Sequence, residues 1–120
     1  MSEVEVTMAG ATAAWQEALG LRCPFPFERT DSQHAMWITL YDRSLWPHGE
    51  ETGIYFYSGQ IDVLARDPVS TSRTMTHELG HAFGLEHSDD PRSVMAGDTG
   101  LNLLPTERDG AEAREALGCE

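Results

Sequence analysis

The sequence predicts a small α+β domain, because helical patterns flank a block of strand patterns. Three runs rich in β-branched and aromatic residues lie between residues 36 and 64, separated by polar segments that contain glycine or proline. An alanine-rich stretch precedes this block, and two segments with helix-capping residues follow it. A length of 120 residues leaves room for one modest core, so residues 1–120 are expected to form a single domain.

The first helix is expected over residues 11–19, where apolar residues recur at helical spacing and Trp15 and Leu19 should face the core. Residues 4–7 alternate between valine and polar residues, which indicates a short strand or tail ahead of this helix. Two prolines within residues 22–27 exclude a helix there and predict a loop with apolar anchors.

The expected strands cover residues 36–41, 53–57 and 60–64. Only Ser58 and Gly59 separate the last two, which is short enough for a tight turn and predicts an antiparallel pair. The first two strands can be parallel or antiparallel, and the sequence leaves both arrangements open.

The second helix is expected from about residue 70 to residue 83, since capping residues and a proline suit its start and Gly84 suits its end. Residues 86–102 are rich in Gly, Asp, Ser and Pro and predict an ordered loop. A last helix should open at residues 105–108 and end at Gly118.

The second helix carries the residues suited to chemistry. His77 and His81 stand four residues apart, which places both imidazoles on one helix face, where they can reach a single ion. His87 supplies a third nitrogen, because Gly84 can adopt the positive φ that turns the chain back. Three protein ligands, with the fourth position left to water, are typical of catalytic zinc. Glu78 lies about 100° around the helix from His77, beside the ion, and fits a general base.

Residues 77–87 fit the pattern HExxHxxGxxH at all five defined positions, which resembles the zinc signature of the metzincin metallopeptidases. Ser93, Val94 and Met95 look like the Met-turn of that family. Together with Ser88, which directly follows the third histidine, they are most similar to the matrixin branch.

This resemblance implies a minimal metzincin-like catalytic domain. Its expected parts are a twisted, mostly parallel sheet with an antiparallel edge strand, a zinc-binding active-site helix, the Met-turn and a C-terminal helix. Met95 is expected to form the hydrophobic floor beneath the zinc, and Gly84 and Ser88 are the other structural residues of the site.

The implied function is that of a zinc-dependent endopeptidase with one catalytic Zn²⁺, which hydrolyses peptide bonds by attack of a zinc-bound water activated by Glu78. The substrate would lie extended along an exposed strand edge, with residues 60–64 as the expected strand. The alternative is a catalytically silent or self-inhibited zinc-binding or peptide-binding module on the same scaffold. Retention of Glu78 favours the enzyme, because a purely structural zinc needs no acid there and usually takes a fourth protein ligand.

Two departures from the matrixin pattern bear on specificity and on metal content. Where matrixins usually carry a Pro-x-Tyr segment after the Met-turn, this chain has Ala96, Gly97 and Asp98, which leaves the substrate preference open. The remaining histidines His34 and His48 lack the spacing of the structural zinc site of vertebrate matrixins, so no second zinc is expected.

The negative net charge bears on which class of molecule the chain can bind. With 20 Asp+Glu against 8 Lys+Arg and a formal net charge of −12, nucleic acid is disfavoured. The apolar stretches are too short for a membrane span. The expected partner is a peptide or protein substrate, and the chain is expected to be a monomer. The acidic N-terminus lacks the pattern of a secretory signal, whereas the resemblance implies export. A secreted or extracytoplasmic location is therefore expected, and a cytoplasmic one stays open.

The two cysteines, Cys23 and Cys119, lie near opposite ends of the chain. A disulfide between them would close nearly the whole chain into one loop, and two unrelated free thiols are the equally open alternative. Residues 22–26 also bear a weaker resemblance to the inhibitory cysteine motif of matrixin propeptides, in which a thiolate occupies the open zinc position.

Overall fold

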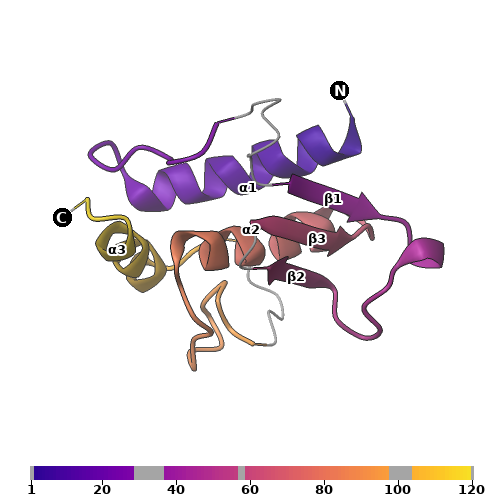
Figure 1. Ribbon diagram of the computed structural model, residues 1–120. Coiled ribbons are helices and arrows are strands. Elements are labelled where there is room, and N and C mark those ends of the chain that lie inside the picture. Colours follow the sequence, from indigo (N-terminus) through magenta and orange to yellow (C-terminus); the bar gives the residue numbers. More distant parts are fainter. Residues whose placement is uncertain (1, 29–36, 57–58, 98–103, 120) are drawn as a thin grey trace.

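The computed structural model describes residues 2–28, 37–56, 59–97 and 104–119, and within them it shows three α-helices, one short 3-10 helix and three strands. This confirms the small α+β class. Helix α1 runs along one side of the molecule, the sheet and α2 lie beneath it, and α3 packs at the end away from the strands (Figure 1). The elements in chain order are α1 (Glu3–Leu19), β1 (Trp37–Tyr41), η1 (Arg43–Leu45), β2 (Gly53–Phe56), β3 (Gln60–Leu64), α2 (Pro68–Phe83) and α3 (Glu107–Ala116).

The strands form a mixed sheet in the order β1-β3-β2. β1 pairs with β3 in parallel, and β2 pairs with β3 in the antiparallel sense, as the short connection between them predicts. The described sheet thus has one parallel and one antiparallel pair, so it is mixed rather than mostly parallel. The expectation that residues 60–64 form the exposed edge is wrong, because β3 is the central strand and both of its sides are paired. The antiparallel edge strand is β2.

Helix α1 begins earlier than the sequence pattern suggests, and it absorbs the stretch 4–7 that was expected to be a strand. Ser2 and Glu5 form a reciprocal capping box, in which the Ser2 hydroxyl accepts from the Glu5 amide at 3.2 Å and the Glu5 carboxylate accepts from the Ser2 amide at 3.1 Å. These bonds satisfy backbone donors that a helix end leaves unpaired. The cap therefore outweighs the β propensity of the two valines, and Thr7 becomes part of the buried helix face.

The core is built around Trp15, which is fully buried as expected. Its indole Nε1 donates to the carbonyl oxygen of Thr76 at 2.8 Å. Its ring packs edge-on against the Phe83 ring, with the ring centroids 5.0 Å apart. Phe25 and Phe27 from the loop after α1 also pack against Phe83, which confirms a loop with apolar anchors. Aromatic contacts of this kind fix how α1 sits on α2.

Helix α2 has defined start and end signals. The Asp67 side chain caps the helix by accepting from the Ser70 amide at 2.9 Å, and Pro68 occupies the first turn. Gly84 closes it in the left-handed conformation with φ 107°, which confirms the expected stop. The helix starts two residues before the expected position because proline is well suited to a first helical turn.

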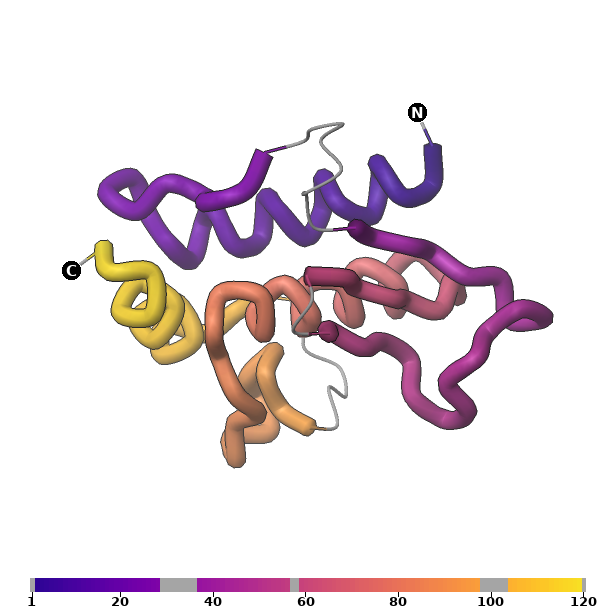
Figure 2. Tube along the Cα trace, in the orientation of Figure 1, coloured from indigo at the N-terminus to yellow at the C-terminus, as the bar shows by residue number. Residues whose placement is uncertain are grey.

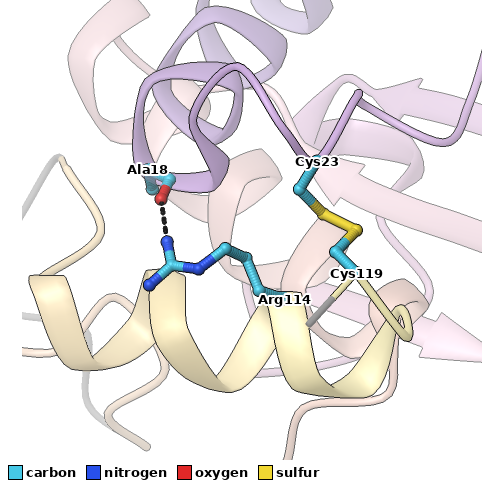
Figure 3. Close-up of a disulfide and its surroundings, with 4 residues drawn as sticks. All are labelled: Ala18, Cys23, Arg114 and Cys119. Carbon is cyan, nitrogen blue, oxygen red and sulfur yellow. Dashed lines mark hydrogen bonds between the residues drawn. A yellow bond between two sulfur atoms is a disulfide. The ribbon is translucent and has the colours of Figure 1, made fainter.

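A disulfide joins Cys23 to Cys119, which resolves the choice between a bridge and two free thiols (Figure 3). It ties the loop after α1 to the end of α3, and the Arg114 guanidinium reinforces the same junction by donating to the carbonyl oxygen of Ala18 at 2.9 Å. Because the sulfur of Cys23 is engaged in this bridge, it is not available as an inhibitory thiolate.

We predict that the double substitution Cys23→Ser/Cys119→Ser lowers the free energy of unfolding by about 2–5 kcal/mol, because the unfolded chain regains the freedom of a long loop. Urea unfolding of the variant and of the wild type, with and without reductant, checks this. Reductant should destabilise only the wild type. Equal stability of the oxidised wild type and the variant would contradict the prediction.

A substitution at Gly80 gives a second test of packing, because α2 packs closely against Met95 and Trp15 at this residue. A Cβ placed on Gly80 would collide with the Met95 sulfur and approach Trp15 Cζ2 to 3.2 Å. We expect Gly80→Ala to lower the free energy of unfolding by about 1–3 kcal/mol through overpacking. Gly10→Ala on α1 is the matched control: a Cβ there would lie 3.3 Å from the Ser72 hydroxyl oxygen, which can rotate away, so the change should be close to neutral. Equal stabilities of the two variants would refute tight packing at Gly80.

Candidate metal centre

The three histidines of the sequence motif come together in the structure. His77 and His81 project from the same face of α2, with ring centroids 4.8 Å apart. After the turn at Gly84 the chain returns, and the His87 ring lies 5.2 Å from that of His77 and 4.9 Å from that of His81. Potential ligand atoms of all three lie within 4.8 Å of one another. Gly84 thus acts as the hinge that brings the third imidazole to the other two.

Two backbone carbonyls set the orientation of the first two rings. The Nδ1 atom of His77 lies 2.6 Å from the carbonyl oxygen of Val94, and Nδ1 of His81 lies 2.8 Å from that of Leu85. A carbonyl oxygen can only accept, so both Nδ1 atoms carry a proton, and in the neutral imidazole each Nε2 atom then presents a lone pair. These two Nε2 atoms are 3.2 Å apart. Two lone pairs that face each other at this distance repel, and a cation between the nitrogens would turn this repulsion into attraction. The donor set therefore fits a metal ion that prefers nitrogen ligands.

The surroundings keep these imidazoles neutral. The pKa of His77 is lowered to about 4, chiefly by burial; the bond to the Val94 carbonyl opposes this shift, and the neighbouring His81 and His87 act in the same direction as burial. Burial also lowers the pKa of His81. Neutral imidazole is the form that binds a metal, so His77 and His81 need not lose a proton to bind one at neutral pH.

Glu78 lies beside the histidine group rather than within it. Only 4 % of Glu78 is exposed, and burial raises the pKa of its carboxyl to about 7, with the negative charge of Glu51 acting in the same direction. The backbone N–H of Tyr55 on β2 donates to this carboxylate and opposes the shift. Gly53 makes the approach of β2 possible, because a Cβ there would collide with Thr74 and lie 3.0 Å from Glu78 Oε2.

A cavity of about 810 Å³ opens over the histidines and Glu78. One wall is β2 together with the residues just before it, and the other is the segment that follows α2. The lining includes Glu50, Glu51, Gly53, Ile54, Tyr55, Glu86 and Gly97 in addition to the three histidines and Glu78. A cleft of this size beside an edge strand can accommodate an extended peptide.

The segment expected to form the Met-turn lies directly against α2. Met95 is 1 % exposed, and its sulfur is the atom nearest to the position that a Cβ of Gly80 would take. Its carbonyl oxygen accepts from the Ser88 amide at 2.8 Å, so Ser88 links the third histidine to this segment. Val94, the preceding residue, supplies the carbonyl that orients His77.

Sequence reasoning missed two residues that hold this arrangement. Asp109 on α3 is 1 % exposed, accepts from the Ser93 hydroxyl at 2.5 Å and accepts from the Val94 amide at 3.1 Å. The spacing from Thr106 to Asp109 is that of a capping box, and both capping bonds are present, so a helix start was visible but the link to Val94 was not. Gly53, the other residue missed, has no comparable signal.

Not every predicted feature can be placed. Asp98 and His34 lie outside the described residues. His48 is described, and its Nε2 lies 2.8 Å from a carboxylate oxygen of Asp62, far along the chain from the metal motif.

Among the described residues, no helix combines the length and apolarity that crossing a membrane requires.

Comparison with known proteins agrees with this geometry. The family model described as matrixin matches residues 30–102, which is more than half of the chain. A protein described as probable matrix metalloproteinase 095L, from Invertebrate iridescent virus 3, is 50% identical over 34 residues. That alignment covers 28% of this chain and 9% of the viral protein, so the chain corresponds to a small part of this relative. On the extent of the family match, the chain belongs to the matrixin family.

Proposed function

We propose that this chain is a zinc-dependent endopeptidase in which His77, His81 and His87 hold one zinc ion and Glu78 is the general base. The observation that carries the proposal is the pair of facing Nε2 atoms, 3.2 Å apart, whose rings are fixed by bonds to backbone carbonyls. When bound, zinc supplies the Lewis acidity that makes water a nucleophile near neutral pH and polarises the scissile carbonyl.

The chain itself supplies the proton transfers. The Glu78 carboxylate lies beside the ligand group, is shielded from bulk water and is held by the Tyr55 N–H. From this position it accepts the proton of the attacking water and delivers it to the departing amine. His77 and His81 are unsuited to this role, because in the proposed site their Nε2 atoms serve as ligands and their Nδ1 protons are donated to carbonyls.

The substrate is proposed to bind along β2 instead of the strand 60–64. β2 is an edge strand, and its residues Gly53, Ile54 and Tyr55 line the cavity. An edge strand can add an extended peptide through backbone hydrogen bonds, which places the peptide across the histidine group.

We assign the segment 93–95 as the Met-turn, with Met95 as the apolar floor. Burial of Met95 against Gly80, one residue before the second histidine, supports this role. The disulfide supports an extracytoplasmic location, since such bridges persist in oxidising compartments. A monomer acting on peptide or protein substrates stays part of the proposal.

The proposed mechanism predicts that Glu78→Gln binds one zinc per chain, as the wild type does, but loses about 10²–10⁴-fold in turnover, because the amide cannot accept the proton. Cleavage of unfolded casein and of a quenched peptide library, with zinc content measured for each protein, checks this. His87→Ala should lose zinc. Glu17→Gln, an exposed change on α1, is the control for altered charge.

Two outcomes would contradict the mechanism. If Glu78→Gln cleaves as fast as the wild type, Glu78 is not the base. If both proteins bind one zinc and neither cleaves, the chain is the silent or self-inhibited zinc-binding module that the sequence left as the alternative.

Asp109→Asn tests whether α3 supports the metal centre. The change weakens the acceptor for the Ser93 hydroxyl and the Val94 amide, and through Val94 it loosens the orientation of His77. We expect a loss of about 1–3 kcal/mol in the free energy of unfolding and about a tenfold weaker zinc affinity, measured by competition with a chelating dye. Asp89→Asn, an exposed change in the loop after His87, should alter neither. Unchanged zinc affinity in Asp109→Asn would separate α3 from the site.

A further inference from the structure

The cavity over the histidines carries negative charge on both walls. Glu50 and Glu51 stand on the side of β2, and Glu86 stands on the side of the segment after α2. All three are exposed, and none of the described residues that line this cavity is an arginine or a lysine. None of the three belongs to the group of potential metal ligands found among the described residues. Their charge therefore remains available to a bound molecule. We call these three carboxylates the acidic rim.

The first wall of the acidic rim is anchored by bonds to its backbone. The Trp46 indole donates to the carbonyl oxygen of Glu51 at 2.8 Å. The carbonyl oxygen of Thr52 accepts from the Leu64 amide at 2.9 Å, which joins this segment to the end of β3. Glu51 is consequently presented at a fixed place where the chain enters β2.

The buried carboxylate of Asp62 contacts the same connection between β1 and β2. Asp62 on β3 is 3 % exposed, and its two oxygens lie 2.8 Å from His48 Nε2 and 2.7 Å from Gln60 Nε2. The His48 ring also meets the Trp46 ring edge-on at 4.8 Å. These contacts attach the connection between β1 and β2 to the central strand, close to the point where Glu50 and Glu51 follow in the chain.

The second wall is fixed by the metal motif itself. Glu86 lies between Leu85 and His87, in the segment that Gly84 turns back. Leu85 is held at both polar atoms of its backbone: its amide donates to the Gly80 carbonyl at 3.0 Å, and its carbonyl accepts from His81. Figure 2 shows the connection between β1 and β2 and the segment after α2 as separate loops in the lower half of the view. The two walls thus come from distant parts of the sequence.

We propose that the acidic rim makes the cleft selective for peptides with lysine or arginine beside the scissile bond, and that it disfavours acidic peptides. This inference rests on the proposed function, because it assigns a substrate class to the same cleft. Each rim carboxylate is exposed and contributes weakly by itself. Three carboxylates around one hollow act together, since a cleft lined by one sign of charge concentrates the field inside it.

The test uses two fluorescently labelled peptides of equal length and equal apolar content, one with two arginines and one with two glutamates at the same positions. Binding to zinc-loaded Glu78→Gln is measured by anisotropy, so that turnover does not interfere. We expect the arginine peptide to bind about tenfold more tightly at low ionic strength, with the difference shrinking as salt screens the rim. Each rim Glu→Gln change should reduce the ratio by about twofold.

A matched pair of triple variants separates the acidic rim from the overall charge of the protein. The rim variant carries Glu50→Gln, Glu51→Gln and Glu86→Gln and should lose most of the preference. The control variant carries Glu3→Gln, Glu17→Gln and Glu28→Gln, three exposed positions outside the cavity, and changes the net charge equally. The control should keep the preference. Equal affinity for both peptides, or equal loss in both variants, would overturn the proposal.

Kinetics with the wild type distinguish this inference from the proposed function. Cleavage of both peptides at equal kcat/KM would overturn the charge preference and leave the peptidase assignment standing. Selective binding of the arginine peptide without any cleavage would overturn the peptidase assignment and support the acidic rim as the determinant of binding.

Discussion

The carbonyl oxygens of Val94 and Leu85 bind the Nδ1 atoms of two imidazoles and so fix the orientation of both rings. The rest of the site depends on that constraint. Because each carbonyl accepts the Nδ1 proton of one ring, the Nε2 atoms of His77 and His81 are forced to converge. The helical spacing of four residues brings the rings near each other, but it does not decide which nitrogen faces inward. Here that decision is made by backbone groups of two turns that follow the helix.

Those turns are themselves held by distant parts of the chain. Asp109 on α3 binds the turn that contains Val94, and the disulfide fastens the end of α3 to the loop after α1. Trp15 of α1 then donates to a carbonyl of α2, one residue before the first histidine. The metal motif covers a short stretch of sequence, yet its geometry requires both ends of the domain.

The sequence predicted the structure best where the conformation depends only on residues close together in the chain. The spacing of His77 and His81 and the stop at Gly84 required only helix geometry, and the structure has them as expected. Residues 4–7 were misassigned because a capping box overrode the preference of valine for strands. The central position of the strand 60–64 depends on parallel pairing with β1 across a long connection, which a local pattern does not encode. Gly53 and Asp109 act through contacts between distant elements, and the capping-box spacing at Asp109 indicates a helix start without its bond to Val94.

If the chain has the peptidase activity proposed above, the Cys23–Cys119 bridge also determines what a cut in its own backbone would do. With the chain closed near both ends, residues 23–119 form a covalent ring. One backbone nick anywhere inside this ring leaves both fragments attached through sulfur, and their high effective concentration keeps them assembled. Self-cleavage in an exposed loop would therefore go unseen on a non-reducing gel and would release two pieces only after reduction. The bridge thus protects the integrity of the molecule as well as its stability.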